Sequence, residues 1–195
     1  MTSRLSAPAR REQLLDVALA VFAESGYHDT SMNDVAERAG VTKPVLYQHF
    51  ESKRELFQAL LDEVGARMAT AITAATSGAT DGKRQTELGF RAYFRWVAED
   101  HDAFMLLYDS GARRDEEFSQ SLRQVTAGMV TTIASLITAD IDDEHRLTLA
   151  HALVGLVEGA SRRLVERGDS FDADEVARQV GDLAWAGLRG IRRQA

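Results

Sequence analysis

The hydrophobic pattern of this chain is helical almost throughout. Apolar residues recur every three or four positions, and no stretch shows the sustained alternation that is typical of a half-buried strand. The 195 residues include only two prolines, Pro8 and Pro44, so few positions oppose a helix. We therefore predict an all-α protein with about nine helices.

Capping residues divide this pattern into segments. Ser31 and Thr42 precede two short apolar patterns as N-caps. Ser52 and Glu55 form a capping box before a long pattern, and Asp172 caps the last one. The predicted helices cover residues 8–25, 31–39, 43–49, 52–76, 84–100, 102–110, 115–139, 144–167 and 173–192.

The most informative segment runs from Thr30 to Lys53. It predicts two short helices joined by a tight turn at Gly40, after a longer first helix that Gly26 ends. This is the order of a helix-turn-helix, in which the second helix lies in the major groove of DNA. Residues 43–49 would form a helix about 10 Å long, close to the groove's width of about 12 Å.

The spacing within the second helix separates an inner face from an outer face. Leu46 and Phe50 are four residues apart, so we expect both to face inward. Their expected neighbours in the core are Phe22, Val35 and Leu56.

The outer face carries side chains suited to DNA. Lys43 can donate to guanine, and Gln48 can pair with adenine. Pro44 or Val45 can contact a thymine methyl group. The candidates for phosphate contacts are Thr42, Tyr47, His49 and Lys53.

Each of these side chains also has an ordinary structural explanation. Tyr47 can be half-buried in the core, His49 can be a surface residue, and Lys53 can be a solvated charge. The distribution of lysine favours the DNA-binding interpretation. The chain has twenty arginines but three lysines, and two of the three, Lys43 and Lys53, lie in this segment.

The net charge of −7 at first argues against a nucleic-acid partner. However, residues 1–55 contain seven Lys and Arg and eight Asp and Glu, so this end is nearly neutral. The acidity lies in residues 56–195, where phosphate repulsion could help orient the other end toward DNA.

The stretch Gly40–Leu56, GVTKPVLYQHFESKREL, resembles the signature of TetR-type (tetracycline-repressor-like) transcriptional regulators. The upstream TSMNDVAERA fits as well, and the resemblance covers about residues 10–57. It implies a DNA-binding domain over residues 1–55 and a ligand-binding and dimerisation domain over residues 56–195, joined by a long helix at about 52–76. The DNA contacts that it implies are Thr42, Lys43, Pro44, Tyr47, Gln48, His49 and Lys53, with Ser31 as a further phosphate contact.

The remainder of the chain suggests a dimer and a hydrophobic effector. The last two helices are apolar over more than one face, as in a two-fold four-helix bundle. The predicted dimer interface contains Leu153, Leu156, Gly159, Val180, Ala184, Gly187 and Leu188. The middle helices concentrate bulky residues that form either a core or an effector pocket, and the pocket candidates are Phe90, Phe94, Trp96, Phe104, Met105, Tyr108, Phe118 and Met129.

Other classes of protein find little support in the sequence. There is no cysteine, no nucleophile elbow, no phosphate loop and no dinucleotide fingerprint, and His145 and His151 do not share a helix face. We expect no catalytic site, no metal and no cofactor. The longest uncharged run, residues 124–139, is too short and polar to span a membrane, and no signal peptide is evident. We therefore expect a cytoplasmic, dimeric, ligand-responsive repressor that binds double-stranded operator DNA. An enzyme in the body domain and an architectural DNA-binding protein without a ligand are the alternatives.

Overall fold

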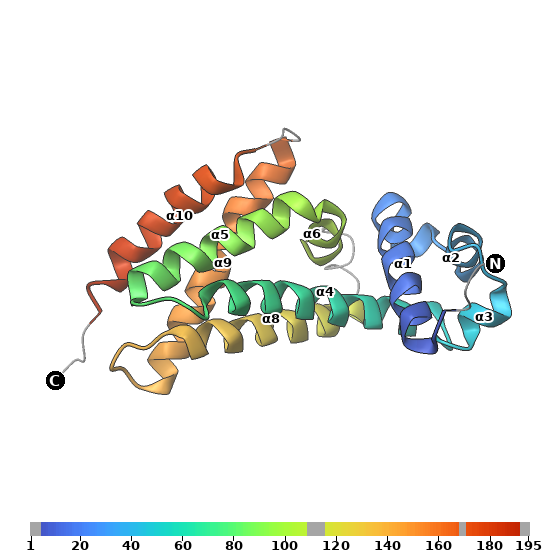
Figure 1. Ribbon diagram of the computed structural model, residues 1–195, viewed down its shortest axis with the longest axis horizontal. Coiled ribbons are helices and arrows are strands. Elements are labelled where there is room, and N and C mark those ends of the chain that lie inside the picture. Colours follow the sequence, from blue (N-terminus) through green and yellow to red (C-terminus); the bar gives the residue numbers. More distant parts are fainter. Residues whose placement is uncertain (1–4, 109–115, 168–170, 192–195) are drawn as a thin grey trace. The chain divides into compact units, whose positions relative to one another are not determined.

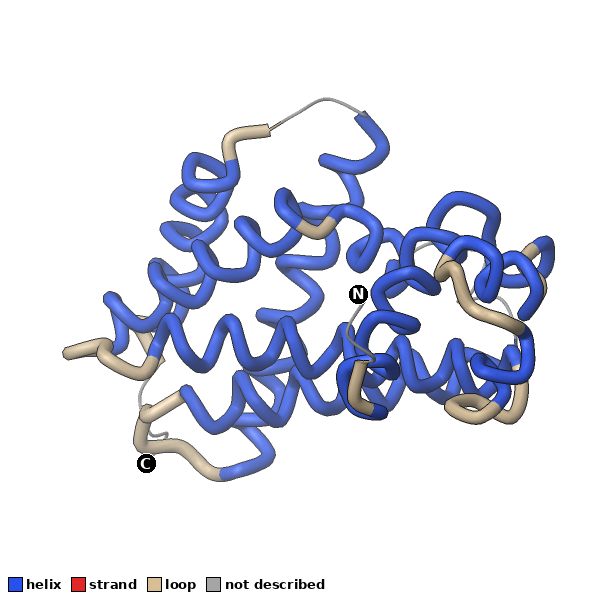
Figure 2. Tube along the Cα trace, turned by 45° about the vertical axis from the view of Figure 1, so that its right-hand side comes forward, coloured by secondary structure: helices blue, strands red, loops and turns tan. Residues whose placement is uncertain are grey.

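The computed structural model describes residues 5–108, 116–167 and 171–191, and in these ranges every regular element is an α-helix (Figure 1, Figure 2). The all-α prediction is confirmed. None of the described helices is long and apolar enough to cross a bilayer. The helices are α1 (Ala7–Asp29), α2 (Met32–Arg38), α3 (Lys43–Tyr47), α4 (Lys53–Thr76), α5 (Gly82–Glu99), α6 (His101–Tyr108), α8 (Glu116–Leu136), α9 (Asp143–Arg167) and α10 (Ala173–Leu188).

Two predicted helices extend further at their C-terminal ends than the observed helices do. The predicted helix 115–139 ends at Leu136, where the Ile137 amide donates to the Ala134 carbonyl in a tighter closing turn. The predicted helix 173–192 ends at Leu188, followed by a similar turn between Gly190 and Gly187. The predicted ends at 109–110, 115 and 192 lie outside the described residues.

Gly26 interrupts α1, as predicted. Its φ of 74° and ψ of 170° are not helical, and glycine reaches such angles without the steric cost of a Cβ. The chain then makes one more turn through Asp29, which the sequence analysis missed. The Thr30 hydroxyl closes this turn by donating to the Gly26 carbonyl at 2.7 Å.

Side-chain caps begin several helices at the expected residues. The Ser52 hydroxyl accepts from the Glu55 amide at 3.1 Å before α4, while the Glu55 carboxylate accepts from the Glu51 amide at 2.6 Å. The predicted capping box is therefore half formed, because its reciprocal bond is displaced by one residue. The Asp172 carboxylate accepts from the first amides of α10, as predicted.

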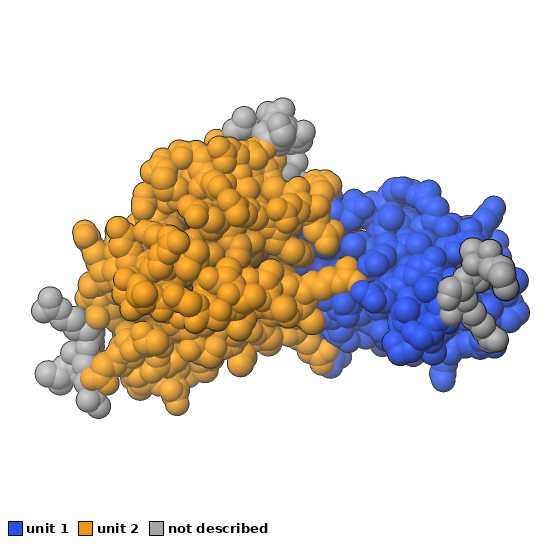
Figure 3. All heavy atoms as spheres, in the orientation of Figure 1, with its two compact units in different colours: residues 1–64, 102–122 blue, residues 65–101, 123–195 orange. Residues whose placement is uncertain are grey.

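Two compact units divide the described chain (Figure 3). Unit 1 contains residues 1–64 and 102–122, and unit 2 contains residues 65–101 and 123–195. Unit 1 thus combines α1 to α3 with the first half of α4, with α6 and with the start of α8. The predicted domain boundary between residues 55 and 56 remains a prediction.

An aromatic cluster forms part of the core of unit 1. The Tyr27 ring lies 4.2 Å from the Phe118 ring and 4.9 Å from the Phe57 ring, measured between centroids. Phe57 in turn lies 4.6 Å from Phe118 and 5.0 Å from Phe22. Edge-on contacts at these distances stabilise aromatic pairs beyond their buried area. The cluster joins the end of α1 to α4 and to the start of α8.

In unit 2, α10 packs along α5 (Figure 1). The Arg95 guanidinium on α5 donates twice to the Asp174 carboxylate at the start of α10, at 2.8 and 2.7 Å. Arg91 approaches the same carboxylate at 3.6 Å. The hydrogen bonds from Arg95 lower the pKa of Asp174 below its ordinary value.

This ion pair predicts a pH-dependent stability. Because the pKa of Asp174 is lower in the folded chain than in the unfolded chain, the pair stabilises the fold at neutral pH and loses its effect as pH falls below about 4. Asp174→Asn should therefore lower the melting temperature at pH 7 and show a smaller difference from wild type at pH 3. Thermal denaturation followed by circular dichroism measures both differences.

Asp182→Asn is the matched control, because it removes an ion pair with Arg178 inside α10 and none to α5. It should change the melting temperature little at either pH. An Asp174→Asn difference that stays constant between pH 7 and pH 3 would contradict the role given to the pair.

Candidate nucleic-acid interface

A reciprocal cap begins α2. The Ser31 hydroxyl accepts from the Asp34 amide at 3.2 Å, and the Asp34 carboxylate accepts from the Ser31 amide at 2.8 Å. The Ser31 hydroxyl also bonds the same carboxylate at 2.8 Å, and this bond is the main reason that the pKa of Asp34 lies below its ordinary value. Ser31, a predicted phosphate contact, is therefore engaged in fixing the start of α2, and its role toward DNA remains a prediction.

Gly40 makes the turn between α2 and α3. Its φ is 64°, in the left-handed region, and it follows the C-cap residue Ala39. The Val41 amide donates to the Ala36 carbonyl and the Gly40 amide to the Glu37 carbonyl, both at 3.0 Å. This bond pattern is a Schellman motif, which ends a helix in a fixed direction and thereby sets where α3 begins.

The helix α3 is short. It covers Lys43–Tyr47, two residues fewer than predicted, although the Phe50 amide still donates to the Leu46 carbonyl beyond its end. Thr42 occupies the N-cap position, but its side chain makes no capping hydrogen bond, so the predicted side-chain cap is absent. Pro44 fits in the first turn because amides there have no intrahelical acceptor.

The inner face of α3 is buried as predicted. Leu46 and Phe50 are both 0 % exposed, and their predicted neighbours Phe22, Val35 and Leu56 are buried as well. The burial of Leu46 determines which side of α3 faces outward.

The outer face carries the predicted DNA-binding side chains. Thr42, Lys43, Pro44 and Gln48 are exposed, and Tyr47 is 41 % exposed despite its ring. The Lys43 ammonium lies 5.9 Å from the centre of the Tyr47 ring. The other two predicted contacts on this segment, Val45 and His49, are half-buried. The structure thus brings together one polar surface around α3, and its contacts with DNA remain a prediction.

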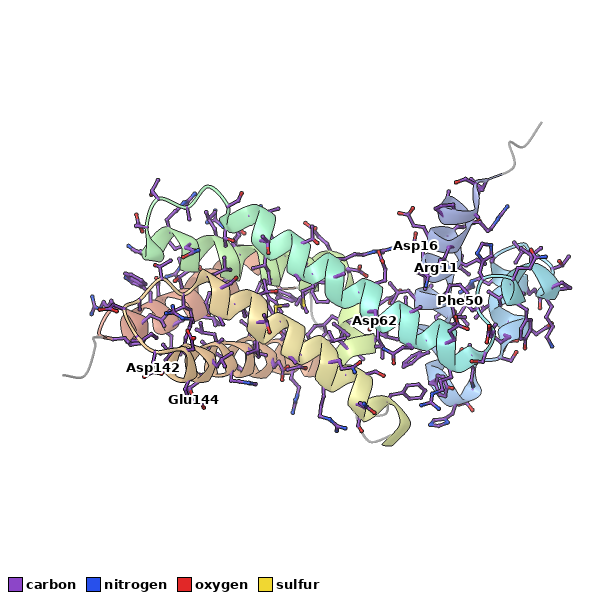
Figure 4. All side chains as sticks on the ribbon, turned by 90° about the horizontal axis from the view of Figure 1, so that it is seen from below. Arg11, Asp16, Phe50, Asp62, Asp142 and Glu144 are labelled. Carbon is purple, nitrogen blue, oxygen red and sulfur yellow. The ribbon has the colours of Figure 1, made fainter. Side chains whose placement is uncertain are left out.

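Arg11 of α1 contacts Phe50, the buried residue just beyond α3, and was missed by the sequence analysis. Its guanidinium lies 4.9 Å from the centre of the Phe50 ring, and both residues are labelled in Figure 4. The residue is exposed, so an α1 cation stands beside the end of α3. The adjacent pair Arg10 and Arg11 near the start of the first helix was the only signal for it in the sequence.

Lys53 follows the recognition segment in the chain, as the first residue of α4. Its ammonium donates to the carbonyls of Tyr27 and Thr30, each at 2.7 Å, and it lies 4.3 Å from the centre of the Tyr27 ring. The predicted phosphate contact by Lys53 is not tested by these bonds, but they show where the ammonium lies in the DNA-free protein.

The predicted effector-pocket residues fall in both compact units. Phe90, Phe94 and Trp96 on α5 and Met129 on α8 are buried in unit 2. Phe104 and Met105 on α6 and Phe118 on α8 belong to unit 1, where Phe104 and Phe118 are buried. The side chain of Tyr108 lies outside the described residues. Their role in a pocket remains a prediction.

Comparison with known proteins identifies the family. The family model for bacterial regulatory proteins of the tetR family matches residues 14–60, and a tetracyclin repressor-like C-terminal domain matches residues 82–187. The chain belongs to the TetR family. It is therefore a DNA-binding transcriptional regulator with an N-terminal helix-turn-helix and a C-terminal helical domain, as the resemblance implied.

Individual TetR-family relatives extend over most of the chain. The transcriptional activator FasR of Mycolicibacterium smegmatis is 30 % identical over 191 residues, covering 97 % of this chain and 87 % of its own. The transcriptional repressor KstR2 of Mycobacterium tuberculosis is 36 % identical over 189 residues, covering 94 % and 82 %. The crystal structure of FadR from Bacillus subtilis with stearoyl-CoA has the same fold, with a TM-score of 0.79 at 19 % identity over 93 % of this chain and 99 % of FadR.

The turn at Gly40 can be tested against a second glycine. Gly40→Ala places a Cβ in the left-handed region and should lower the free energy of unfolding by about 1–2 kcal/mol. Gly128→Ala in α8 is the control, because no atom lies within 4 Å of the added Cβ and alanine favours a helix. It should raise the free energy of unfolding by about 0.5–1 kcal/mol.

Urea denaturation measures the free energy of unfolding of both variants. If Gly40→Ala proved as stable as Gly128→Ala, the left-handed turn would not be the constraint that we assign to it.

Proposed function

We propose that this TetR-family protein is a dimeric repressor that acts in the cytoplasm, binds a palindromic operator and releases it when a hydrophobic effector binds. The observation that carries the DNA-reading part is the exposed polar face of α3, held outward by the buried pair Leu46 and Phe50. An α-helix presented in this way fits the major groove, where side chains distinguish all four base pairs.

Base recognition is assigned to the start of α3 and to Gln48 at its C-cap. Lys43 donates to guanine O6 and N7, Gln48 pairs with adenine, and Pro44 with Val45 contacts a thymine methyl group. Thr42, Tyr47, His49 and Lys53 contact phosphates, and Ser31 is a further phosphate contact. Two observations support these roles. The Thr42 hydroxyl makes no capping hydrogen bond, and the Tyr47 ring is 41 % exposed and not fully buried in the core.

Dimerisation is assigned to α9 and α10. Leu183 is 64 % exposed and Leu147 is 41 % exposed, which are high values for large apolar side chains. Of the predicted interface residues, Ala184 is buried within the chain, whereas Leu153, Leu156, Gly159, Val180, Gly187 and Leu188 retain exposed surface. Two recognition helices must reach half-sites about 34–36 Å apart, so a dimer is needed. A monomer in sedimentation at micromolar concentration would count against this assignment.

The effector is proposed to be an acyl-coenzyme A or a molecule of similar hydrophobic character. FadR of Bacillus subtilis, which shares the fold, was crystallised with stearoyl-CoA. Buried Phe90, Phe94 and Met129 supply the apolar surface that an acyl chain requires, and methionine adapts readily to a ligand's shape. Binding must favour the conformation that does not bind DNA, because equal affinity for both conformations shifts nothing.

The choice of repression over activation is inferred from the family. Relatives include proteins named as a repressor and as an activator, and repression follows if the operator overlaps a promoter and binding excludes the polymerase. An architectural DNA-binding protein would show no effector response, and an enzyme would convert the added ligand.

Selection of bound sequences from random DNA tests the operator assignment. We expect an inverted repeat whose half-sites are one helical turn apart between centres, whereas a single half-site would contradict the dimer. Lys43→Ala should then cost about 1–3 kcal/mol on the selected operator and relax the preference at one base position. Lys83→Ala, a change at an exposed lysine of unit 2, is the matched control and should leave the preference unchanged.

Titration with stearoyl-CoA tests the effector assignment. Binding should quench Trp96 or Trp185, and Trp185→Phe assigns the signal to one of them. Operator affinity should fall about 5–150-fold, which corresponds to a coupling of about 1–3 kcal/mol. Coenzyme A without the acyl chain is the control. Unchanged operator binding at saturating stearoyl-CoA would exclude this effector, and hydrolysis of the thioester would favour the enzyme.

A further inference from the structure

The guanidinium of Arg11 in α1 is an exposed cation that lies over an aromatic ring. Its central carbon is 4.9 Å from the centre of the Phe50 ring, and Phe50 itself is 0 % exposed. A guanidinium over the face of a ring is attracted by the ring's electrons, and this contact requires none of its five N–H donors. Phe50 therefore holds the guanidinium in place and leaves its donors available.

No group in the described part of the chain uses these donors. Within residues 5–108, 116–167 and 171–191, Arg11 has neither an ion pair nor a hydrogen bond. Arg38 in the same unit is different, because it donates twice to the Glu24 carboxylate, at 2.5 and 2.6 Å. The charge of Arg38 is thus balanced by an anion, whereas in the described residues no carboxylate is bound to Arg11.

Phe50 places this cation at the end of α3. The Phe50 amide donates to the Leu46 carbonyl at 3.0 Å, so Phe50 continues directly from the last turn of the helix. Its ring also lies 6.5 Å from the His49 ring, measured between centroids. The ring that holds Arg11 is therefore the neighbour of a proposed phosphate contact.

The Lys43 ammonium shows a similar arrangement at the start of α3. It lies 5.9 Å from the centre of the Tyr47 ring, as Arg11 lies over Phe50. A cation is therefore present at the start of α3 and another just beyond its end. In DNA, phosphate backbones border the major groove on both sides, and the planar fork of an arginine matches two oxygens of one phosphate.

We propose that Arg11 binds a backbone phosphate of the operator, so that α1 joins α3 at the DNA interface. This inference rests on the proposed function in that α3 occupies the major groove. The contact with Phe50 orders the guanidinium before DNA binds, which reduces the entropy lost on binding. Because phosphates are the same in every sequence, Arg11 contributes affinity without base preference. The tetR family model begins at residue 14 and does not include Arg11.

The salt dependence of DNA binding tests the proposal. Arg11→Met keeps a flexible side chain beside the Phe50 ring but removes the charge. It should weaken operator binding roughly tenfold and reduce the slope of log affinity against log salt concentration by about 0.9. The smaller slope should also appear on a duplex of unrelated sequence at low salt, because phosphate contacts do not depend on sequence. An unchanged slope would overturn the proposal.

Arg38→Met is the matched control. It removes one positive charge from the same unit, and it breaks an exposed ion pair of a kind that contributes little to stability. It should leave the slope at its wild-type value. An equal fall in slope for Arg38→Met and Arg11→Met would mean that the net charge of unit 1 sets the slope, and the assignment to Arg11 would be wrong.

Neutral phosphates locate the contact. In operator duplexes with a single methylphosphonate at successive positions, the neutral group should weaken wild-type binding roughly tenfold at one position and at its symmetry mate. At these positions it should leave the binding of Arg11→Met unaffected. A cost that is the same for both proteins at every position would show that Arg11 acts only through the packing of Phe50, and the phosphate contact would be refuted.

Modification of wild-type arginines gives a readout that needs no variant. With phenylglyoxal followed by mass spectrometry, Arg11 should react in the free protein and be protected by operator, whereas Arg84 of unit 2 should react equally in both states. Equal reactivity of Arg11 with and without operator would overturn the proposal, even if Arg11→Met did not fold.

The proposed function and the role of Arg11 can fail separately. If Lys43→Ala relaxed the base preference while Arg11→Met kept the wild-type slope, only the role of Arg11 would fail. If Lys43→Ala left the preference unchanged, base reading by Lys43 would fail, while a smaller slope for Arg11→Met would still establish the phosphate contact.

Discussion

The burial of Leu46 and Phe50 is the contact on which the recognition surface depends. The helix α3 has five residues, far below the length at which a helix is stable alone in water, so its conformation must come from packing. Both side chains are completely buried, and full burial of a leucine or phenylalanine contributes about 1.5–3 kcal/mol. The burial of Leu46 within α3, and of Phe50 three residues after its end, therefore both stabilises and orients the helix. Its outer face can carry the exposed polar side chains of Lys43 and Gln48 because the fully buried contacts lie on the opposite face.

Polar contacts around α3 complete what packing begins. The Schellman turn at Gly40 fixes the direction in which the chain enters α3, and the Ser31–Asp34 cap fixes the start of α2. The Lys53 ammonium, at the start of α4, donates to the Tyr27 and Thr30 carbonyls at the end of α1. A five-residue helix supported on all these sides can present its side chains with little freedom. Recognition of base edges benefits from this, because pre-ordered groups lose less entropy on binding.

The sequence predicted the parts of this arrangement that local rules determine. The spacing of Leu46 and Phe50 gave the inner face of α3, Gly26 and Gly40 gave the interruptions, and the family signature gave the DNA-binding end. Contacts between distant residues could not be predicted in this way. The bonds from Lys53 span more than twenty residues, and nothing in the neighbourhood of Lys53 in the sequence indicates that carbonyls at the end of the first helix will be its acceptors.

The division into compact units also depends on contacts between residues that are distant in the sequence. The family resemblance implied one domain over residues 56–195, which stays a prediction, and the compact units group α6 and the start of α8 with the DNA-reading helices. Phe118 shows why. Its ring contacts Tyr27 and Phe57, and Tyr27 is also the residue whose ring and carbonyl meet the Lys53 ammonium. The start of α8 thus packs, through Phe118, against the residue whose carbonyl accepts from the Lys53 ammonium.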